Sequence, residues 1–83
     1  MTREEILPRL YKIINAIVSE PPRLTAETDI VKDLGLDSLA VMRMLEEVED
    51  EFDVLIPLNV ISEVRTLDDF AGQLLGLLEK EER

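Results

Sequence analysis

The sequence contains no cysteine, no histidine and no tryptophan. Without cysteine it has neither a disulfide framework nor thiolate chemistry, which fits a reducing compartment. Without histidine it cannot build a Ser-His-Asp triad, and the common zinc sites are excluded because they use cysteine and histidine ligands. The sequence therefore predicts neither an enzyme that acts alone nor a protein with a dedicated metal site.

Aromatic and basic residues are scarce. Aromatic side chains make up 4% of the chain and apolar residues 46%, so the core must be built from Leu, Ile, Val and Met. The length predicts one domain, residues 1–83. Nine basic residues stand against nineteen acidic ones, for a net charge of −10. This balance argues against nucleic-acid binding, which needs clustered Lys or Arg.

Long apolar runs are absent too. No run approaches the roughly 18 residues that a membrane span needs, and the first residues lack the basic and apolar regions of a signal peptide. We therefore expect a monomer in the cytoplasm, with no membrane or nucleic-acid partner.

What the chain does contain is helical periodicity, because apolar residues recur at three- and four-residue spacing almost throughout. Two capping-box pairs, Thr2 with Glu5 and Thr66 with Asp69, mark the starts of the first and last helices. Pro8 predicts a first helix that is frayed or kinked before it. The expected fold is all-α: a small bundle of three longer helices and one short helix, with a long structured loop between the first two. The expected helices cover residues 3–18, 38–52, 59–64 and 67–79.

Several positions are expected to face the core or a neighbouring helix. The four-residue spacing of Gly72 and Gly76 puts both on one face, which permits close approach of another helix. The long loop should be held to the core by its apolar residues Leu24, Ile30, Val31 and Leu34. The buried stripe of the second helix should consist of Val41, Met44, Leu45, Val48 and Phe52.

Ser38 lies where the second helix begins. A serine there is often only a helix N-cap, whose side chain accepts a hydrogen bond from the first turn. The same place sets the hydroxyl among unsatisfied backbone N–H groups at the positive end of the helix dipole, which suits an attached phosphate. We interpret Ser38 as an attachment point, and the N-cap remains the alternative.

The wider pattern resembles the acyl carrier protein family. Its elements are the run Gly35-Leu36-Asp37-Ser38-Leu39, an acidic amphipathic helix that ends near Phe52, and the pair Ile56-Pro57 about eighteen residues after the serine. The resemblance extends over nearly the whole chain.

The resemblance implies that Ser38 carries a 4′-phosphopantetheine arm, which a separate phosphopantetheinyl transferase adds from coenzyme A. Asp37 and Leu39 would then belong to the recognition motif of that transferase. The thiol of the arm would hold an acyl group as a thioester for partner enzymes such as a ketosynthase, an acyltransferase or a ligase. The chain would be a carrier and not a catalyst.

The acidic second helix is also a candidate docking surface, since residues 37–53 hold seven acids against Arg43 alone. Such a field steers association with basic partners, although a merely solvated helix face is the plainer interpretation. The expected docking residues are Leu39, Met42, Arg43, Glu46, Glu47, Glu49 and Asp50. The candidates for lining an apolar pocket for the cargo are Met42, Met44, Ile56, Ile61 and Val64.

The chain departs from the family pattern at two positions of the motif. Fatty-acid carriers usually have acidic residues where this chain has Ala40 and Arg43. Arg43 is similar to the residue found in the peptidyl carrier domains of peptide synthetases, so an aminoacyl cargo or a specialised lipid-modifying pathway stays open. A second alternative is an acidic helical adaptor, in which Ser38 would be only a cap.

Overall fold

Four helices form the molecule in the computed structural model, which describes residues 1–20 and 22–81. The regular secondary structure of this part is entirely helical, so the predicted all-α fold is confirmed. Each helix begins and ends within two residues of its expected range. None of the helices in the described part has the length and apolar character needed to cross a membrane. The helices are α1 Arg3–Ile17, α2 Ser38–Phe52, α3 Leu58–Glu63 and α4 Leu67–Glu81.

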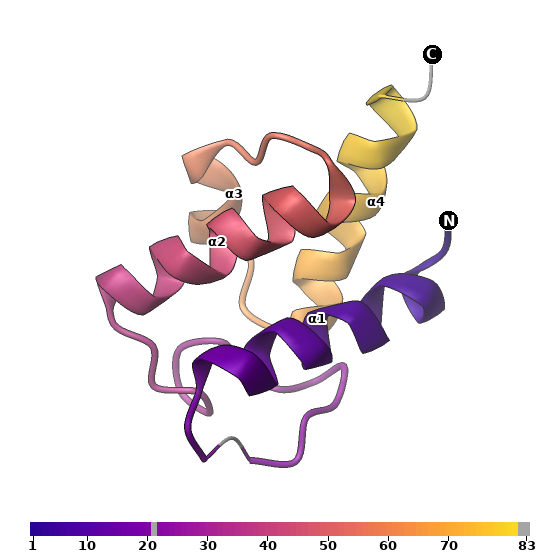
Figure 1. Ribbon diagram of the computed structural model, residues 1–83. Helices are drawn as coiled ribbons and strands as arrows, with labels where there is room; N and C mark the ends of the chain where they lie inside the picture. Colours follow the sequence, from indigo (N-terminus) through magenta and orange to yellow (C-terminus); the bar gives the residue numbers. More distant parts are fainter. Residues whose placement is uncertain (21, 82–83) are drawn as a thin grey trace.

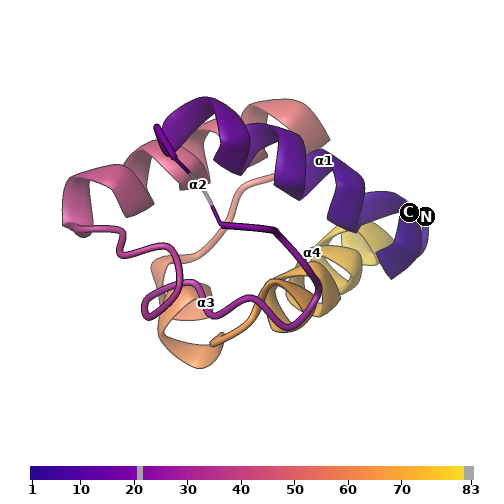
Figure 2. The same ribbon diagram turned by 90° about the horizontal axis from the view of Figure 1, so that it is seen from below.

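Helix α1 is the centre of the arrangement, because it packs against both α2 and α4 (Figures 1 and 2). The short α3 packs against α4. The core is aliphatic, as the composition predicts, apart from two phenylalanines. Val41 is only half-buried, while the other four members of the expected α2 stripe are buried. The largest side chains with almost no exposure are Ile6, Leu10, Ile14, Met44, Val48, Leu67, Phe70 and Leu74.

The first turn of α1 is fixed by the predicted capping box. The Thr2 hydroxyl accepts the N–H of Glu5 at 3.3 Å, and the Glu5 carboxylate accepts the N–H of Thr2 at 2.9 Å. The predicted fraying before Pro8 is wrong, since α1 runs without interruption from Arg3 to Ile17. The cap and the fully buried Ile6 hold the turn that precedes Pro8. One missing ladder hydrogen bond is therefore not enough to break the helix.

The long connection between α1 and α2 is tied to the start of α4. Ile30 donates its N–H to the Arg65 carbonyl at 2.9 Å, and Asp68 donates its N–H to the Ala26 carbonyl at 2.8 Å. This pairing gives the loop a fixed path in which Ile30 points into the core. The prediction that Val31 is held to the core is wrong, because the next residue along that path turns outward and is 68% exposed.

The two glycines of α4 do not share a neighbour. A Cβ at Gly72 would lie 2.5 Å from the guanidinium of Arg3, which also pairs with Asp68 at 3.1 Å. Nothing lies within 4 Å of a Cβ at Gly76. The close approach expected from the glycine spacing is thus made at Gly72 alone, and by a side chain of α1 rather than by a helix backbone.

Candidate functional site

Ser38 is the first residue of α2, and Asp37 is its N-cap. The Asp37 backbone is extended, with φ −84° and ψ 178°, and its carboxylate accepts the N–H of Ala40 at 2.8 Å. The alternative in which Ser38 is the cap is therefore wrong, since the preceding carboxylate fills that role. The Ser38 side chain is exposed and has no hydrogen-bond partner among the described residues.

The backbone around Ser38 offers donors to an anion. The N–H of Ala40 is bound by the Asp37 carboxylate, and the N–H of Val41 donates to the Asp37 carbonyl at 2.9 Å. The N–H groups of Ser38 and Leu39 have no acceptor in the described part of the chain. They are the unsatisfied donors of the first turn, at the positive end of the helix dipole. A phosphate ester on the Ser38 hydroxyl would be stabilised there.

No basic side chain is hydrogen-bonded to Ser38 within the residues that the structure describes. Among the described residues the groups with perturbed acidity lie on other helices: burial raises the pKa of Tyr11 on α1, and hydrogen bonds from the backbone lower the pKa of Asp69 on α4. Among the described residues no group of acidic side chains is arranged to hold a metal ion.

The outer face of α2 carries most of the expected docking residues. Leu39 is 74% exposed and Met42 46% exposed, and both stand close to Ser38 in the sequence. Glu49 differs from the rest, because it is half-buried and its carboxylate accepts the N–H of Ile56 at 2.9 Å. It holds the loop after α2 in place. The remaining expected docking residues, all exposed, are Arg43, Glu46, Glu47 and Asp50.

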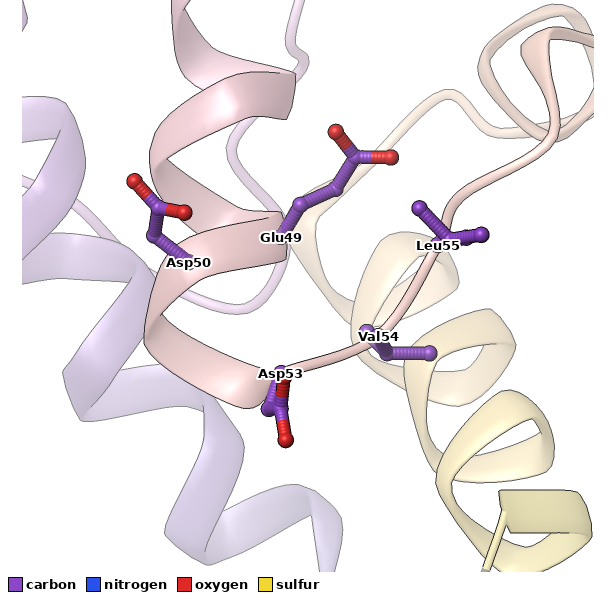
Figure 3. A pocket seen from close by; sticks show the side chains of 5 residues that line it. All are labelled: Glu49, Asp50, Asp53, Val54 and Leu55. Carbon is purple, nitrogen blue, oxygen red and sulfur yellow. The ribbon is translucent and has the colours of Figure 1, made fainter.

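A surface pocket of about 360 Å³ lies at the other end of α2 from Ser38. Figure 3 shows the side chain of Glu49 extending toward the segment that carries Leu55, while Asp53 points away from it. Glu49 lies eleven positions after Ser38, which is about 16 Å along a helix. This acidic pocket is therefore remote from Ser38. Its lining residues are Glu49, Asp50, Asp53, Val54 and Leu55.

None of the expected cargo-lining residues lines this pocket. Met44 and Ile56 are part of the packed core, at 1% and 8% exposure. Met42 lies on the outer surface instead. Ile61 and Val64 are half-buried and pack against the core. The structure thus does not bring the five residues together around one cavity.

The exposed apolar side chains before and at the start of α3 are not among the residues predicted from the sequence. Leu55 is 81% exposed and Leu58 is 69% exposed, while Val54 and Ile56 on either side of Leu55 are buried. An alternating burial of this kind follows from extended backbone, whose successive side chains point to opposite sides. The run Val54-Leu55-Ile56 before Pro57 indicates such an extended segment, because the helical pattern ends before it and all three residues are apolar.

Comparisons with known proteins identify a family that the chain resembles over most of its length. A family model described as the phosphopantetheine attachment site matches residues 8–74. The chain is 34% identical over 80 residues to the meromycolate extension acyl carrier protein of Mycolicibacterium smegmatis, covering 95% of this chain and 81% of that protein. It is 30% identical over 77 residues to an acyl carrier protein of Rhodococcus erythropolis, with 92% and 85% covered.

The fold is similar to a solved structure as well. That structure is of a proposed acyl carrier protein from Mycobacterium tuberculosis, with a TM-score of 0.74 and 29% sequence identity. The match covers 83% of this chain and 93% of the solved chain. The likeness therefore extends beyond the serine motif to the arrangement of the helices.

Proposed function

Because the chain belongs to the acyl carrier protein family, we propose that Ser38 is the residue that carries its 4′-phosphopantetheine arm. The observation that supports this assignment is an exposed hydroxyl at the first position of α2. It is not used as the N-cap, because Asp37 caps the helix. It lies inside the stretch that the family model matches.

The residues around Ser38 are suited to an anionic ester. The free N–H groups of Ser38 and Leu39, together with the helix dipole, favour the negative charge by about 0.3–1 kcal/mol. Asp37 keeps the first turn of α2 formed and so holds the backbone of Ser38 at the start of the helix. The arm supplies a thiol that holds the acyl group as a thioester. The chain itself is a carrier and performs no chemistry on the cargo.

The proposed partners follow from this role. A phosphopantetheinyl transferase would recognise Asp37 and the exposed Leu39, which stand on either side of the serine. Acyl-processing enzymes such as a ketosynthase, an acyltransferase or a ligase would then dock on the outer face of α2. We place the cargo in lipid metabolism, supported by the relatives named for meromycolate extension.

Intact-mass spectrometry tests the assignment. The purified chain is incubated with coenzyme A, Mg²⁺ and a promiscuous phosphopantetheinyl transferase, and should gain the mass of one phosphopantetheine group. Ser38→Ala should gain nothing. Ser19→Ala is the matched control, since Ser19 is also exposed but lies outside any helix, and it should be modified like the wild type. Equal modification of Ser38→Ala would refute the proposal.

A further inference from the structure

Arg43 is a single positive charge on an acidic helix. It is the one base among residues 37–53, which contain seven acids. Its side chain is exposed, and no ion pair joins it to a carboxylate among the described residues, although Glu46 and Glu47 stand three and four positions on. Arg3 and Arg9, by contrast, pair with Asp68 and Glu51 at 3.1 and 3.7 Å. The guanidinium of Arg43 is therefore available to a partner.

Arg43 lies on the exposed face of α2, close to Ser38. Leu39, Arg43 and Asp50 recur at helical spacing and form one stripe on the face opposite the buried Met44 and Val48. Arg43 is five residues after Ser38, which is about 7.5 Å along the axis. A partner that contacts α2 beside Ser38 therefore contacts Arg43 as well.

The surroundings of Arg43 make its charge important in a complex. Leu39 and Met42, at 74% and 46% exposure, are the exposed apolar side chains of α2 among the described residues. Contact with them removes water from the neighbourhood of the guanidinium. A charge that loses its water without gaining a partner opposes association strongly, and one that faces a like charge opposes it further.

We propose that the enzymes which take cargo from this chain present a carboxylate opposite Arg43, and basic side chains opposite Glu46 and Asp50. This inference rests on the proposed function of Ser38 and adds the chemistry of the partner. Arg43 then acts as a specificity-determining residue, which disfavours enzymes whose docking surface is uniformly basic.

A charge-reversal experiment tests this pairing. The probe is a ketosynthase with a uniformly basic docking surface, together with a panel of its variants in which each basic surface residue is singly replaced by glutamate. The phosphopantetheinylated, acyl-loaded chain is compared with its Arg43→Glu variant, and the rate of acyl transfer to the ketosynthase cysteine is measured. Lys12→Glu is the matched control, because it changes the net charge equally from an exposed position on α1.

The expected result is a crossover. Arg43→Glu should react faster than the wild type with the unaltered basic ketosynthase, by about tenfold, which corresponds to one close charge pair. At least one glutamate variant of the ketosynthase should reverse this order. Lys12→Glu should behave like the wild type with every member of the panel.

Three results would overturn the inference. One is an equal rate of acyl transfer from the loaded wild type and the loaded Arg43→Glu variant to every ketosynthase of the panel. Another is a change in transfer rate in Lys12→Glu equal to that in Arg43→Glu, which would show that only the net charge of the chain matters. The third is a dimer of the wild type in sedimentation that Arg43→Glu dissociates, because a second copy would then cover Arg43. Failure to load Ser38 at all is a different outcome and refutes the proposed function itself.

Discussion

Alanine at position 37 should destabilise the protein more than alanine at position 38, although Ser38 is the proposed attachment site. The Asp37 carboxylate accepts the N–H of Ala40 at 2.8 Å, and losing an N-cap of this kind costs about 1 kcal/mol. Removing its negative charge from the positive end of α2 adds about 0.3–1 kcal/mol. Asp37→Ala should therefore lose about 1–2 kcal/mol of unfolding free energy.

The same reasoning makes Ser38→Ala nearly neutral. The Ser38 hydroxyl has no hydrogen-bond partner in the described part of the chain, and alanine is the better helix former by about 0.5 kcal/mol. Urea unfolding followed by circular dichroism measures the unfolding free energy of both variants. In thermal unfolding, each kcal/mol corresponds to about 4–8 °C in Tm for a domain of this size. Asp37→Asn keeps an acceptor oxygen and should retain most of the stability.

A loss of 1 kcal/mol or more in Ser38→Ala, with Asp37→Ala unchanged, would refute this reasoning, because the serine would then be the cap in solution. The stability measurement also serves as a control for the phosphopantetheinylation test of Ser38→Ala. If Ser38→Ala is as stable as the wild type, its failure to accept the arm is a chemical effect and not an effect of unfolding.

Three further substitutions test features of the fold. Gly76→Ala should raise the unfolding free energy by about 1 kcal/mol, because its new Cβ meets nothing within 4 Å. Gly72→Ala should raise it less, because its Cβ would meet the Arg3 guanidinium. Equal gains of the two variants in urea unfolding would contradict this. Asp53→Gly should also stabilise by about 1 kcal/mol, since Asp53 has a φ of 52° and a negative charge at the C-terminus of α2; a lower Tm would count against it. Hydrogen bonds from two backbone N–H groups just before α4 lower the pKa of Asp69 from its ordinary 3.8, so its carboxylate stabilises the fold above about pH 4 and ceases to do so as the pH falls through the lowered pKa. The Tm difference between the wild type and Asp69→Asn should therefore be full near neutrality and vanish in acid, and a difference that persists in acid would show another cause.

The parts of the fold that follow from local spacing could be predicted from the sequence. Thr66 and Asp69 stand three residues apart, and the structure has the reciprocal hydrogen bonds that this spacing permits, each at 3.1 Å. The helices themselves follow in the same way from the period of their apolar residues. Asp37 and Ser38 are different, because both are good N-caps and are adjacent in sequence. Only the extended backbone of Asp37 decides between them.

The parts that depend on distant contacts could not be predicted. Ile30 and Val31 are chemically alike and adjacent, yet the pairing of the loop with the residues before α4 buries one and exposes the other. The pattern places Gly72 and Gly76 on one face correctly, but it does not show that the Arg3 side chain fills the space beside only one of them. The pocket at the end of α2 likewise depends on the path of the loop that contains Leu55.

The tie between the long connection and the start of α4 also sets an order for folding during synthesis. The carbonyls of Ala26 and Thr28 accept N–H groups of Asp68 and Leu67, and the N–H of Ile30 donates to the Arg65 carbonyl. A nascent chain that has emerged from the ribosome only as far as α3 has none of these partners. The loop that leads to Ser38 can therefore take its final form only after the residues at the start of α4 have been made.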